Sequence, residues 1–371
     1  MRIGIDAKWY FSGPPSGVNV VRNIVNNIIE FNEGNEILFI LNKKDIHLKN
    51  IIIDKINNKN NLFLLFIPCK INFLTNLFIL PFYLKKKKLD VMLFQNYIPL
   101  WGDSKTKYVN YVHDILFLDY PQYFTTLERI IYRLMLTSIK QASHVITISK
   151  SERNRIITHT NILSENISFV YHGLDPIFQE TTEDIKEKIK IKYNLPDDFI
   201  LFVGRINIRK NIITLLRSCS ILKNDISLVI VGKEEKNGFD IKAEICKLGI
   251  ENKVNLIGYL PDDELAKIVS SAKIFVFLSY AEGFGLPPLE AMKSGVPTII
   301  SNVTSLPEVC GDAAISIDVD DYRELAFKIE LLLKDKELYN YYKNKGLNKS
   351  KEYTWNKSII KILDILKAEK K

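Results

Sequence analysis

The stretch Glu282-Gly-Phe-Gly-Leu-Pro-Pro-Leu-Glu290 is the most informative part of this 371-residue chain. It places two carboxylates eight residues apart, one in a glycine-rich loop and one beyond a pair of prolines. Because proline is tolerated at the first helical position, a helix is expected to begin near Pro287 and to carry Glu290 on its first turn. The N–H groups at that helix end, together with Gly283 and Gly285, would suit a phosphate or a sugar phosphate. A plainer interpretation is that Glu290 is only a first-turn carboxylate stabilised by the helix dipole.

The residues from Glu282 to Pro297, followed by residues 298–314, resemble the donor-site signature of the retaining glycosyltransferases of family 4, which have the GT-B fold. The resemblance implies that Glu282 lies beside the transferred sugar and that Glu290 holds the ribose hydroxyls of a nucleotide. It also implies that the amides of three residues face the sugar and the phosphate: Phe284, Gly285 and Leu286.

Short apolar segments alternate with helix-length amphipathic ones along the whole chain, which is the pattern of an α/β protein with parallel sheets. The expected strands of a first set are 3–6, 37–41, 62–67, 91–95, 108–112, 145–149 and 167–171. Those of a second set are 199–203, 227–231, 254–258, 274–278, 298–301 and 314–317. We therefore predict a GT-B fold of two Rossmann-like, doubly wound domains facing a central cleft, where ligands would meet the carboxyl ends of the strands.

Turn-rich residues 173–180 separate the two sets of strands and define the expected domains. Residues 1–175 form an N-terminal Rossmann-like domain on the acceptor side, and residues 176–352 form a C-terminal Rossmann-like domain that binds a nucleotide-sugar donor. Residues 353–371 form a closing helix, because Tyr353-Thr-Trp355 before an amphipathic run resembles the segment that crosses back onto the N-terminal domain in this fold.

Two cations follow the first strand of the second set, in the run LFVGRINIRKNI of residues 201–212. Gly204 and Arg205 come directly after the strand, and Lys210 begins the next helix. Arg205 offers a fork of donors and Lys210 a point charge, so the pair could neutralise a diphosphate, although Arg205 alone could equally be structural. Family 4 members typically have this Gly-Arg-x4-Lys arrangement, with both cations on the leaving nucleoside diphosphate.

In the first domain, Gly13-Pro-Pro-Ser-Gly17 precedes an amphipathic helix expected from about Val18 to Asn32. Its N–H groups could meet a β-phosphate, with Gly17 as the binding residue, but the spacing is not that of a dinucleotide fingerprint. His113 ends a strand in a segment that resembles the strand-end His-Asp pair of the family, where the histidine approaches the sugar and Asp114 would support it. A structural histidine is the commoner case at such a position.

Two further motifs have ordinary explanations. Ser149-Lys-Ser151 resembles the family segment that begins a helix near the cleft, although Ser149 could simply cap that helix. Asp318-Val-Asp320 could pass for a metal-binding D-x-D motif, but it directly precedes an expected helix, where a turn or capping carboxylate is favoured. No metal site is therefore expected.

Composition limits the class of protein. The length favours two domains, and 47% hydrophobic with 25% charged residues is ordinary for a globular chain.

The net charge is +8, and residues 1–180 hold 21 Lys and Arg against 15 Asp and Glu. This excess of positive charge would suit an anionic membrane, nucleic acid or a phosphorylated substrate, or it could serve solubility alone. Four scattered cysteines, without zinc or disulfide spacing, fit a reducing cytosol. The opening MRIGIDA resembles a buried strand, so export through a signal peptide is not expected.

The longest apolar stretch, residues 71–84, is too short for a membrane span, which needs about twenty residues. It is followed at once by Lys85 to Lys88, and such a combination can lie among the headgroups of an anionic leaflet. Alternatively, these residues form a helix that packs on a sheet and the lysines are its solvated end. The apolar side chains near helical spacing are Phe73, Leu74, Leu77, Phe78 and Leu84.

These features predict a cytoplasmic enzyme, with peripheral contact at the inner face of a membrane and no nucleic-acid partner. It would be a retaining hexosyltransferase that uses a nucleotide sugar and a saccharide or polyprenyl-linked acceptor, in the biosynthesis of a bacterial surface polysaccharide such as lipopolysaccharide or capsule. Its catalytic residues would be His113, Glu282, Arg205 and Lys210. Because cations and N–H dipoles can stabilise a leaving diphosphate, neither a cofactor nor a metal is expected.

The donor and the enzyme class leave alternatives open. The segments GIDAKWY, HDILFLDYPQYF and EGFGLPPLEAM look most like mannosyltransferase-type members, so GDP-mannose is the first donor prediction, with UDP and dTDP donors as alternatives. A sugar-nucleotide epimerase or a phosphorylase could share the fold. A non-catalytic GT-B subunit that binds a glycan or stabilises a partner enzyme is the alternative from another class.

Overall fold

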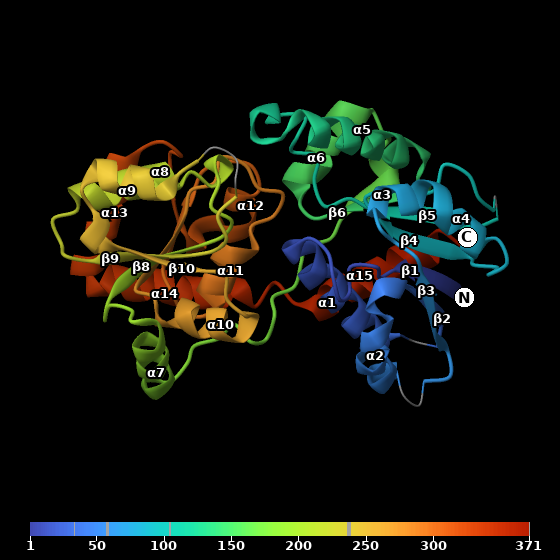
Figure 1. Cartoon of the computed structure of the whole chain (residues 1–371), viewed down its shortest axis with the longest axis horizontal. Coiled ribbons are helices and arrows are strands. Elements are labelled where there is room, and N and C mark those ends of the chain that lie inside the picture. The colour runs from blue at the N-terminus through green and yellow to red at the C-terminus, as the bar shows by residue number, and fades with distance from the viewer. Residues whose placement is uncertain (33, 57–58, 104, 236–238, 371) are drawn as a thin grey trace. The chain divides into compact units, whose positions relative to one another are not determined.

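A computed structural model describes residues 1–32, 34–56, 59–103, 105–235 and 239–370. It divides into two compact units (Figure 1). Unit 1 consists of residues 1–173 with residues 354–371, and unit 2 of residues 174–353. Both units are Rossmann-like, with a parallel sheet between helices, as the predicted fold class requires.

Unit 1 holds, over its described residues, a seven-stranded parallel sheet in the order β3-β2-β1-β4-β5-β6-β7. The strands are β1 (Arg2–Asp6), β2 (Glu36–Asn42), β3 (Leu62–Ile67), β4 (Val91–Gln95), β5 (Lys107–Tyr111), β6 (His144–Thr147) and β7 (Ile167–Phe169). The strand order reverses between β1 and β4, which makes the sheet doubly wound. All five residues of β4 are buried, as expected for a central parallel strand covered on both faces.

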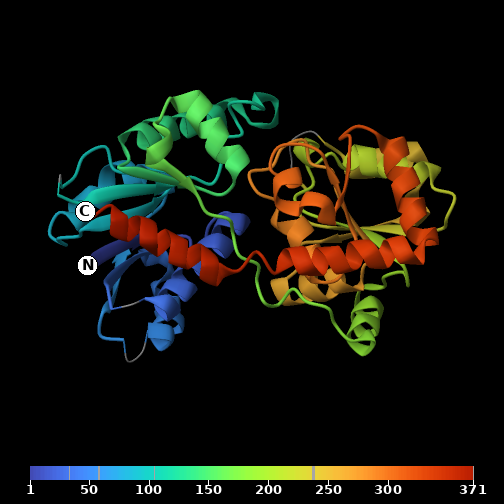
Figure 2. The ribbon, with the colours of Figure 1, turned by 180° about the vertical axis from the view of Figure 1, so that it is seen from behind.

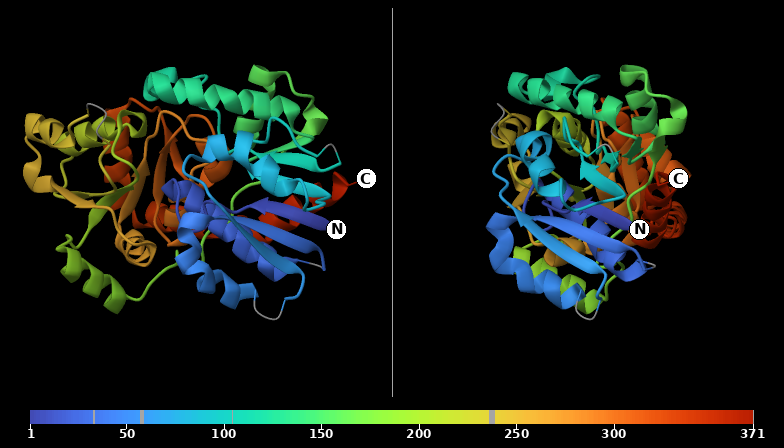
Figure 3. Two further views of the ribbon diagram at one scale, coloured as in Figure 1. Left: turned by 45° about the vertical axis from the view of Figure 1, so that its right-hand side comes forward. Right: turned by 90° about the vertical axis from the view of Figure 1, so that its right-hand side faces the viewer.

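Helices cover both faces of this sheet. They are α1 (Pro15–Phe31), α2 (Lys49–Ile56), α3 (Asn72–Leu74), α4 (Leu80–Leu84), α5 (Thr126–Gln141), α6 (Lys150–Thr160) and α15 (Trp355–Ala368). Figures 1 and 3 show α5 and α6 on one side of the sheet and α1, α2 and α15 on the other. A π-helical turn, η2 (Thr75–Ile79), joins α3 to α4, and its Leu77 shares a core cluster with Met135 and Ile139 of α5.

Unit 2 holds, within the part of the chain that the structure describes, a six-stranded parallel sheet in the order β10-β9-β8-β11-β12-β13. The strands are β8 (Phe199–Val203), β9 (Ser227–Val231), β10 (Val254–Gly258), β11 (Ile274–Phe277), β12 (Thr298–Ser301) and β13 (Ile315–Ile317). The helices are α7 (Glu183–Tyr193), α8 (Ile212–Ile221), α9 (Ile241–Leu248), α10 (Asp262–Ser271), α11 (Leu286–Lys293), α12 (Leu306–Cys310), α13 (Tyr322–Lys334) and α14 (Lys336–Ser350). The order reverses between β8 and β11, so the loops that follow these two strands share one sheet edge.

Short helical turns complete the described chain. They are η1 (Lys43–Leu48), η3 (Pro121–Tyr123), η4 (Ser164–Asn166), η5 (Ile208–Lys210), η6 (Glu251–Lys253) and η7 (Gly311–Ala313). Every predicted strand is present, and the ends differ by two residues at most. One helix start was predicted too late, since α1 begins at Pro15 rather than near Val18. Helix α11 begins at Leu286, next to the predicted Pro287.

The closing helix α15 belongs to unit 1, where it contacts α1 and β4 (Figure 2). The chain therefore passes between the units twice, at residues 173–174 and 353–354. These two passages run side by side, since the Leu174 amide donates to the Tyr353 carbonyl at 3.2 Å. A Cβ at Gly173 would lie 2.1 Å from the Trp355 backbone nitrogen, so only glycine allows this approach.

Among the described residues, no helix combines the length and the apolar character that crossing a bilayer requires.

Candidate functional site

The carboxyl edge of the unit 2 sheet brings together a carboxylate and two cations. The Glu282 Oε1 atom lies 2.6 Å from Lys210 Nζ and 3.2 Å from Arg209 Nη1. Lys210 comes from η5 after β8, and Glu282 comes from the loop after the neighbouring strand β11. The Tyr280 amide donates to the Arg209 carbonyl at 2.9 Å, which ties the two loops together. The structure thus joins predicted Lys210 and Glu282, and adds Arg209, which sequence reasoning passed over.

Burial sets the protonation of this cluster. The three side chains are 9–12% exposed, and the Lys210 ammonium lies 4.6 Å from the centre of the Phe277 ring. Burial lowers the pKa of Lys210 to about 8, with Glu282 acting in the opposite direction. Burial would raise the pKa of Glu282, but Lys210 and Arg209 outweigh it and lower that pKa to about 2. The cluster is therefore charged at neutral pH, with one more cation than anions.

Arg205 lies apart from this cluster in its contacts. Its Nη1 atom is 2.6 Å from Glu235 Oε1, and its side chain is 57% exposed. Asn207 donates to the other Glu235 oxygen at 2.7 Å and accepts the Lys210 amide at 3.2 Å. The Gly204 amide donates to the Val231 carbonyl at 3.0 Å, so it serves the sheet. Arg205 is thus an exposed cation beside the cluster. It is paired with Glu235, which an anionic ligand would have to displace.

The loop that carries Glu282 is held by the turn before α12. The Thr304 hydroxyl accepts the Glu282 amide at 3.0 Å, and Thr304 itself has a φ of +52°. The Ser305 hydroxyl contacts the carbonyls of Glu282 at 2.9 Å and Phe284 at 2.7 Å. The Phe284 side chain is 4% exposed and packs against the Tyr353 ring, so only its backbone can face a ligand.

Gly285 caps the start of α11 in a conformation that favours glycine. Its φ is +115°, and a Cβ there would lie 2.6 Å from Leu306 Cδ2. Leu286 is the first helical residue, and the two prolines that follow carry no N–H. An anion at this helix end would therefore meet amides near residues 285–286.

Glu290 is not a first-turn carboxylate, which corrects the sequence interpretation. Because α11 begins at Leu286, Glu290 is its fifth residue, and the first turn contains no acidic residue. Its side chain is buried, and the described residues show no hydrogen bond to its carboxylate. Burial, helped by Asp262 and Asp175, raises the pKa of Glu290 to about 8 against the effect of Lys293. Helix-dipole stabilisation does not explain a carboxyl group that is buried at this cost.

In unit 1, a tryptophan that sequence reasoning did not single out connects the two predicted residues. A Cβ at Gly17 would lie 2.8 Å from the Trp9 ring, and one at Gly13 would lie 2.7 Å from it, so the glycine-rich loop rests directly on the indole. The same ring lies 5.7 Å from the His113 ring. Trp9 follows β1 and His113 follows β5, both at the carboxyl edge of the unit 1 sheet. The alternation of strands and loops in the sequence indicates that Trp9 lies at this edge. It does not indicate which residues the ring contacts.

Trp9 is anchored by a buried network at the end of β1. The Lys8 ammonium group forms an ion pair with Asp6 and donates to Asn76 Oδ1 at 2.6 Å. Asn76 in turn donates to Asp6 Oδ2 at 2.9 Å. All three side chains are almost fully buried. Asn76 lies in the π-helical turn η2 and also donates to the Tyr97 carbonyl at 2.9 Å. A satisfied buried network of this kind holds the adjoining backbone in one position.

His113 is half-buried and has defined partners. Its Nε2 atom lies 3.0 Å from Gln95 Oε1, and its amide donates to Asn96 Oδ1 at 3.1 Å. Burial lowers the pKa of His113 to about 4, so the imidazole is neutral at physiological pH. The Asp114 carboxylate accepts the Leu116 amide at 3.3 Å. His113 is therefore suited to hydrogen bonding with a neutral ligand such as a sugar hydroxyl.

Residues of the remaining sequence motifs bind backbone amides at a turn or a helix start. The Ser149 hydroxyl accepts the Glu152 amide at 3.0 Å and caps α6, while Glu152 accepts the Ile115 amide at 2.6 Å beyond His113. Asp318 accepts the amide of Asp320 at 3.1 Å in a turn, and the next residue, Asp321, caps α13. Among the residues that the structure describes, no group of three His, Cys, Asp or Glu side chains could hold a metal ion.

Known proteins resemble this chain in fold and in family. The model of Glycosyltransferase Family 4 matches residues 19–178, and that of Glycosyl transferases group 1 matches residues 183–349. The solved structure of HepE from Anabaena, in complex with UDP and glucose, superposes with a TM-score of 0.75 at 18% identity, over 99% of this chain and 100% of that one. Fold and family models together define a glycosyltransferase of the GT-B type.

Within that class, the chain belongs to glycosyltransferase family 4 and is mannosyltransferase-like. It is 33% identical to the serotype-specific mannosyltransferase WbdA of Escherichia coli over 60% of this chain and 28% of that protein. It is 31% identical to O-antigen chain mannosyltransferase B of Escherichia coli over 66% of this chain and 65% of that protein. The matched part of the chain spans less than two thirds of either relative.

Proposed function

We propose that this chain is a retaining hexosyltransferase that moves a mannosyl group from GDP-mannose to a saccharide or polyprenyl-linked saccharide. The observation that carries the proposal is the buried cluster of Glu282, Lys210 and Arg209 at the carboxyl edge of the unit 2 sheet. A site with one carboxylate and two cations can receive a diphosphate without a large rearrangement, because the ligand adds the missing negative charge.

In the proposed reaction, the bond from the sugar C1 to the diphosphate oxygen breaks. A new bond forms from C1 to an acceptor hydroxyl on the same face, and the proton of that hydroxyl passes to the oxygen of the departing diphosphate. Lys210 and Arg209 would stabilise the charge that develops on the leaving oxygens, with Arg205 released from Glu235 as a further donor. Glu282 would then face the sugar, and retention of configuration is the outcome that the family resemblance implies.

We assign the remaining predicted residues as follows. Glu290 would accept the ribose hydroxyls, which would give its buried carboxylate the hydrogen bonds that the protein does not supply. The amides of Gly285 and Leu286 would meet the sugar and phosphate at the start of α11. In unit 1, His113 would approach the sugar and Gly17 the diphosphate or acceptor.

The choice of a mannosyl donor rests on the relatives, since WbdA and O-antigen chain mannosyltransferase B are both named mannosyltransferases. HepE was solved with UDP, so a UDP sugar is the competing donor. By the same relationship, we propose a role in O-antigen or another bacterial surface polysaccharide. The enzyme would act from the cytoplasm at the inner face of the membrane, and would need no metal because cationic side chains take the charge of the diphosphate.

Thermal stabilisation by GDP, UDP, dTDP and ADP, first with EDTA and then with magnesium, tests the donor proposal. Selective stabilisation by GDP in EDTA is the expected result. Stronger stabilisation by a nucleotide with another base would mean that the donor carries that base instead of guanine. In transfer assays, Lys210→Ala and Glu282→Ala should each lower turnover by about a hundredfold or more while the fold remains intact by circular dichroism.

Lys188→Ala is the matched control, because Lys188 is an exposed lysine of the same unit, paired with Asp184 on α7. It should leave turnover unchanged. Wild-type turnover in both site variants would reject the assignment of the cluster. A wild-type protein that responds to none of the four nucleotides and transfers no sugar would favour a non-catalytic GT-B subunit.

A further inference from the structure

The helical segment of residues 72–84 in unit 1 is apolar on both of its faces. Leu77, Leu80 and Leu84 are buried toward the sheet, as a packed helix requires. On the outer face, Leu74 is 38% exposed, Phe78 47% and Phe82 70%. A helix at the surface of a globular protein normally presents polar residues outward, so this face is expected to meet an apolar environment.

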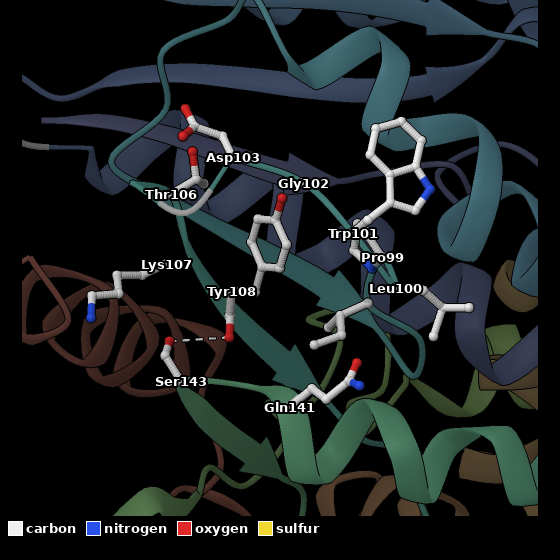
Figure 4. Close-up of a pocket in the computed structure, with 11 residues that line it drawn as sticks. Pro99, Leu100, Trp101, Gly102, Asp103, Thr106, Lys107, Tyr108, Gln141 and Ser143 are labelled. Atoms are coloured by element: carbon white, nitrogen blue, oxygen red, sulfur yellow. Dashed lines mark hydrogen bonds between the residues drawn. The ribbon is translucent and has the colours of Figure 1, made fainter.

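The loop after β4 extends this apolar face. Trp101 is 42% exposed, and its ring packs edge-on against Phe82 with 4.6 Å between centroids. Figure 4 shows Trp101 extending away from Asp103 and Tyr108, which line an open pocket of about 310 Å³. The Leu100 amide donates to the Leu77 carbonyl at 3.3 Å, so the loop is fastened to the helical segment. The exposed aromatic pair is thus held by defined contacts.

Lysines flank the aromatic pair. Lys85, Lys86 and Lys88 are exposed directly after α4, Lys105 is exposed in the loop that carries Trp101, and Lys107 is exposed at the start of β5. Within the described ranges, none of these lysines lies within 4.0 Å of a carboxylate. An unpaired cationic rim around exposed aromatic side chains complements a surface that is apolar inside and anionic outside.

Helix α5 carries a second exposed apolar stripe on the same side of the sheet. Leu127 is 67% exposed, Ile130 61% and Leu134 40%, at helical spacing. Because α5 shares a core cluster with Leu77, this stripe belongs to the same helical layer as the outer face of residues 72–84. The outer surface of this helical layer therefore exposes apolar side chains from both α5 and residues 72–84.

We propose that the outer face formed by residues 72–88 and Trp101 binds the surface of an anionic bilayer. The Phe82–Trp101 pair would enter the headgroup region while the lysines meet anionic lipid phosphates. This inference deepens the proposed function, because a polyprenyl-linked acceptor is presented at a membrane. An anionic bilayer fits better than a protein partner, because the face combines exposed aromatic side chains with unpaired lysines that follow the short helix α4.

Sedimentation of the full-length chain with vesicles tests this surface. Wild type should bind phosphatidylcholine vesicles that contain phosphatidylglycerol, and should bind pure phosphatidylcholine weakly. Replacing Lys85 to Lys88 by glutamine should lower the partition coefficient by about 600-fold, since each of the four lysines near an anionic surface contributes roughly a fivefold factor. Phe82→Ser with Trp101→Ser should lower it by about tenfold or more.

Matched controls lie on unit 2. Glutamine at Lys186, Lys188, Lys190 and Lys192 on α7 removes the same charge, and Ile191→Ser with Phe327→Ser removes two exposed apolar side chains. Both controls should bind vesicles like wild type. Vesicles should also shift the emission of wild type to shorter wavelength, and Trp101→Phe should abolish that shift.

Three results would overturn the proposal. The first is equal loss of binding in the control variants, and the second is no binding of wild type to anionic vesicles at low salt. The third is a dimer in ultracentrifugation that Phe82→Ser with Trp101→Ser dissociates, which would assign the face to a second copy of the chain. Nucleotide stabilisation of the same variants should match wild type, so failure of the membrane proposal is distinguishable from failure of the proposed function.

Discussion

At the scale of single residues, Lys210 is the group whose charge depends on its environment. It is 9% exposed on its side chain and shares Glu282 with Arg209. Because burial lowers the pKa of Lys210 to about 8, the free protein loses this cation within an accessible pH range. A bound diphosphate would favour the ammonium form and raise that pKa.

Nucleotide binding should therefore take up a proton at alkaline pH. Between pH 7 and 8 the affinity for the nucleoside diphosphate should change little, and above about 8 it should fall toward tenfold per pH unit. Calorimetry at pH 9 in two buffers with different ionisation enthalpies measures the uptake directly. Lys210→Ala should show weak binding without uptake, and a wild-type affinity that stays constant up to pH 9.5 would contradict the prediction.

Burial of the Glu290 carboxyl group should lower the free energy of unfolding of the ligand-free protein at neutral and alkaline pH. Its pKa is raised from 4.5 to about 8, so the unfolded carboxyl ionises above about pH 4.5 while the folded one stays protonated. The stability that it contributes is complete below pH 4.5 and is lost as the pH rises toward 8. Glu290→Gln should thus stabilise the free protein by about 1–3 kcal/mol at pH 8 and by little near pH 4.5, in denaturant titrations.

The same substitution should weaken nucleotide binding, because the amide cannot replace a carboxylate as acceptor for two ribose hydroxyls. Glu187→Gln on the exposed part of α7 is the control and should change neither property. Equal stabilisation by Glu290→Gln at both pH values would show that ionisation of this carboxyl is not what costs stability.

At the scale of elements, the loop and helix of residues 282–293 depend on a glycine. Gly285→Ala should destabilise the protein by about 2 kcal/mol or more, because it adds a Cβ 2.6 Å from Leu306 to a residue with a φ of +115°. Since the displaced backbone carries Glu282, turnover should fall as well. Chemical denaturation and transfer assays measure the two effects.

Gly249→Ala separates backbone strain from steric conflict. Gly249 also has a positive φ, +65°, but nothing lies within 4 Å of the Cβ position. It should cost about 1 kcal/mol and leave turnover unchanged. If the two variants were equally stable, the contact with Leu306 would not be what requires glycine at position 285.

The elements themselves were predictable because their signals are local. Strand β8 carries the continuous apolar run FILFV, which periodicity detects without any knowledge of its neighbours. The start of α11 was predicted near Pro287 and lies at Leu286, which is within the ordinary variation of a helix end. The burial of Glu290 was not predictable in the same way, because it depends on the elements that pack around α11.

At the scale of the whole molecule, two adjacent passages of the chain join the units. Gly173→Ala should destabilise the protein by about 2 kcal/mol or more, because its Cβ would lie 2.1 Å from the Trp355 nitrogen, and backbone cannot move aside as a side chain can. Urea titration checks this. Gly346→Ala on α14 is the control, since its Cβ would come no closer than 3.1 Å to Met292 Cγ and alanine favours a helix, so the expected change is below about 1 kcal/mol. Equal effects would mean that the passage tolerates a side chain.

The sequence alone determined the α/β class, the two sets of strands and the residues that end strands at each sheet edge, because hydrophobic period and turn chemistry are properties of neighbouring residues. Only the tertiary structure decided which of those residues meet. Lys210 and Glu282 are 72 positions apart and touch because β8 and β11 are neighbours in the sheet. Arg209 rather than Arg205 joins them, and the Trp9 ring lies against both Gly17 and His113. Such contacts depend on strand order and side-chain direction, which no local pattern encodes.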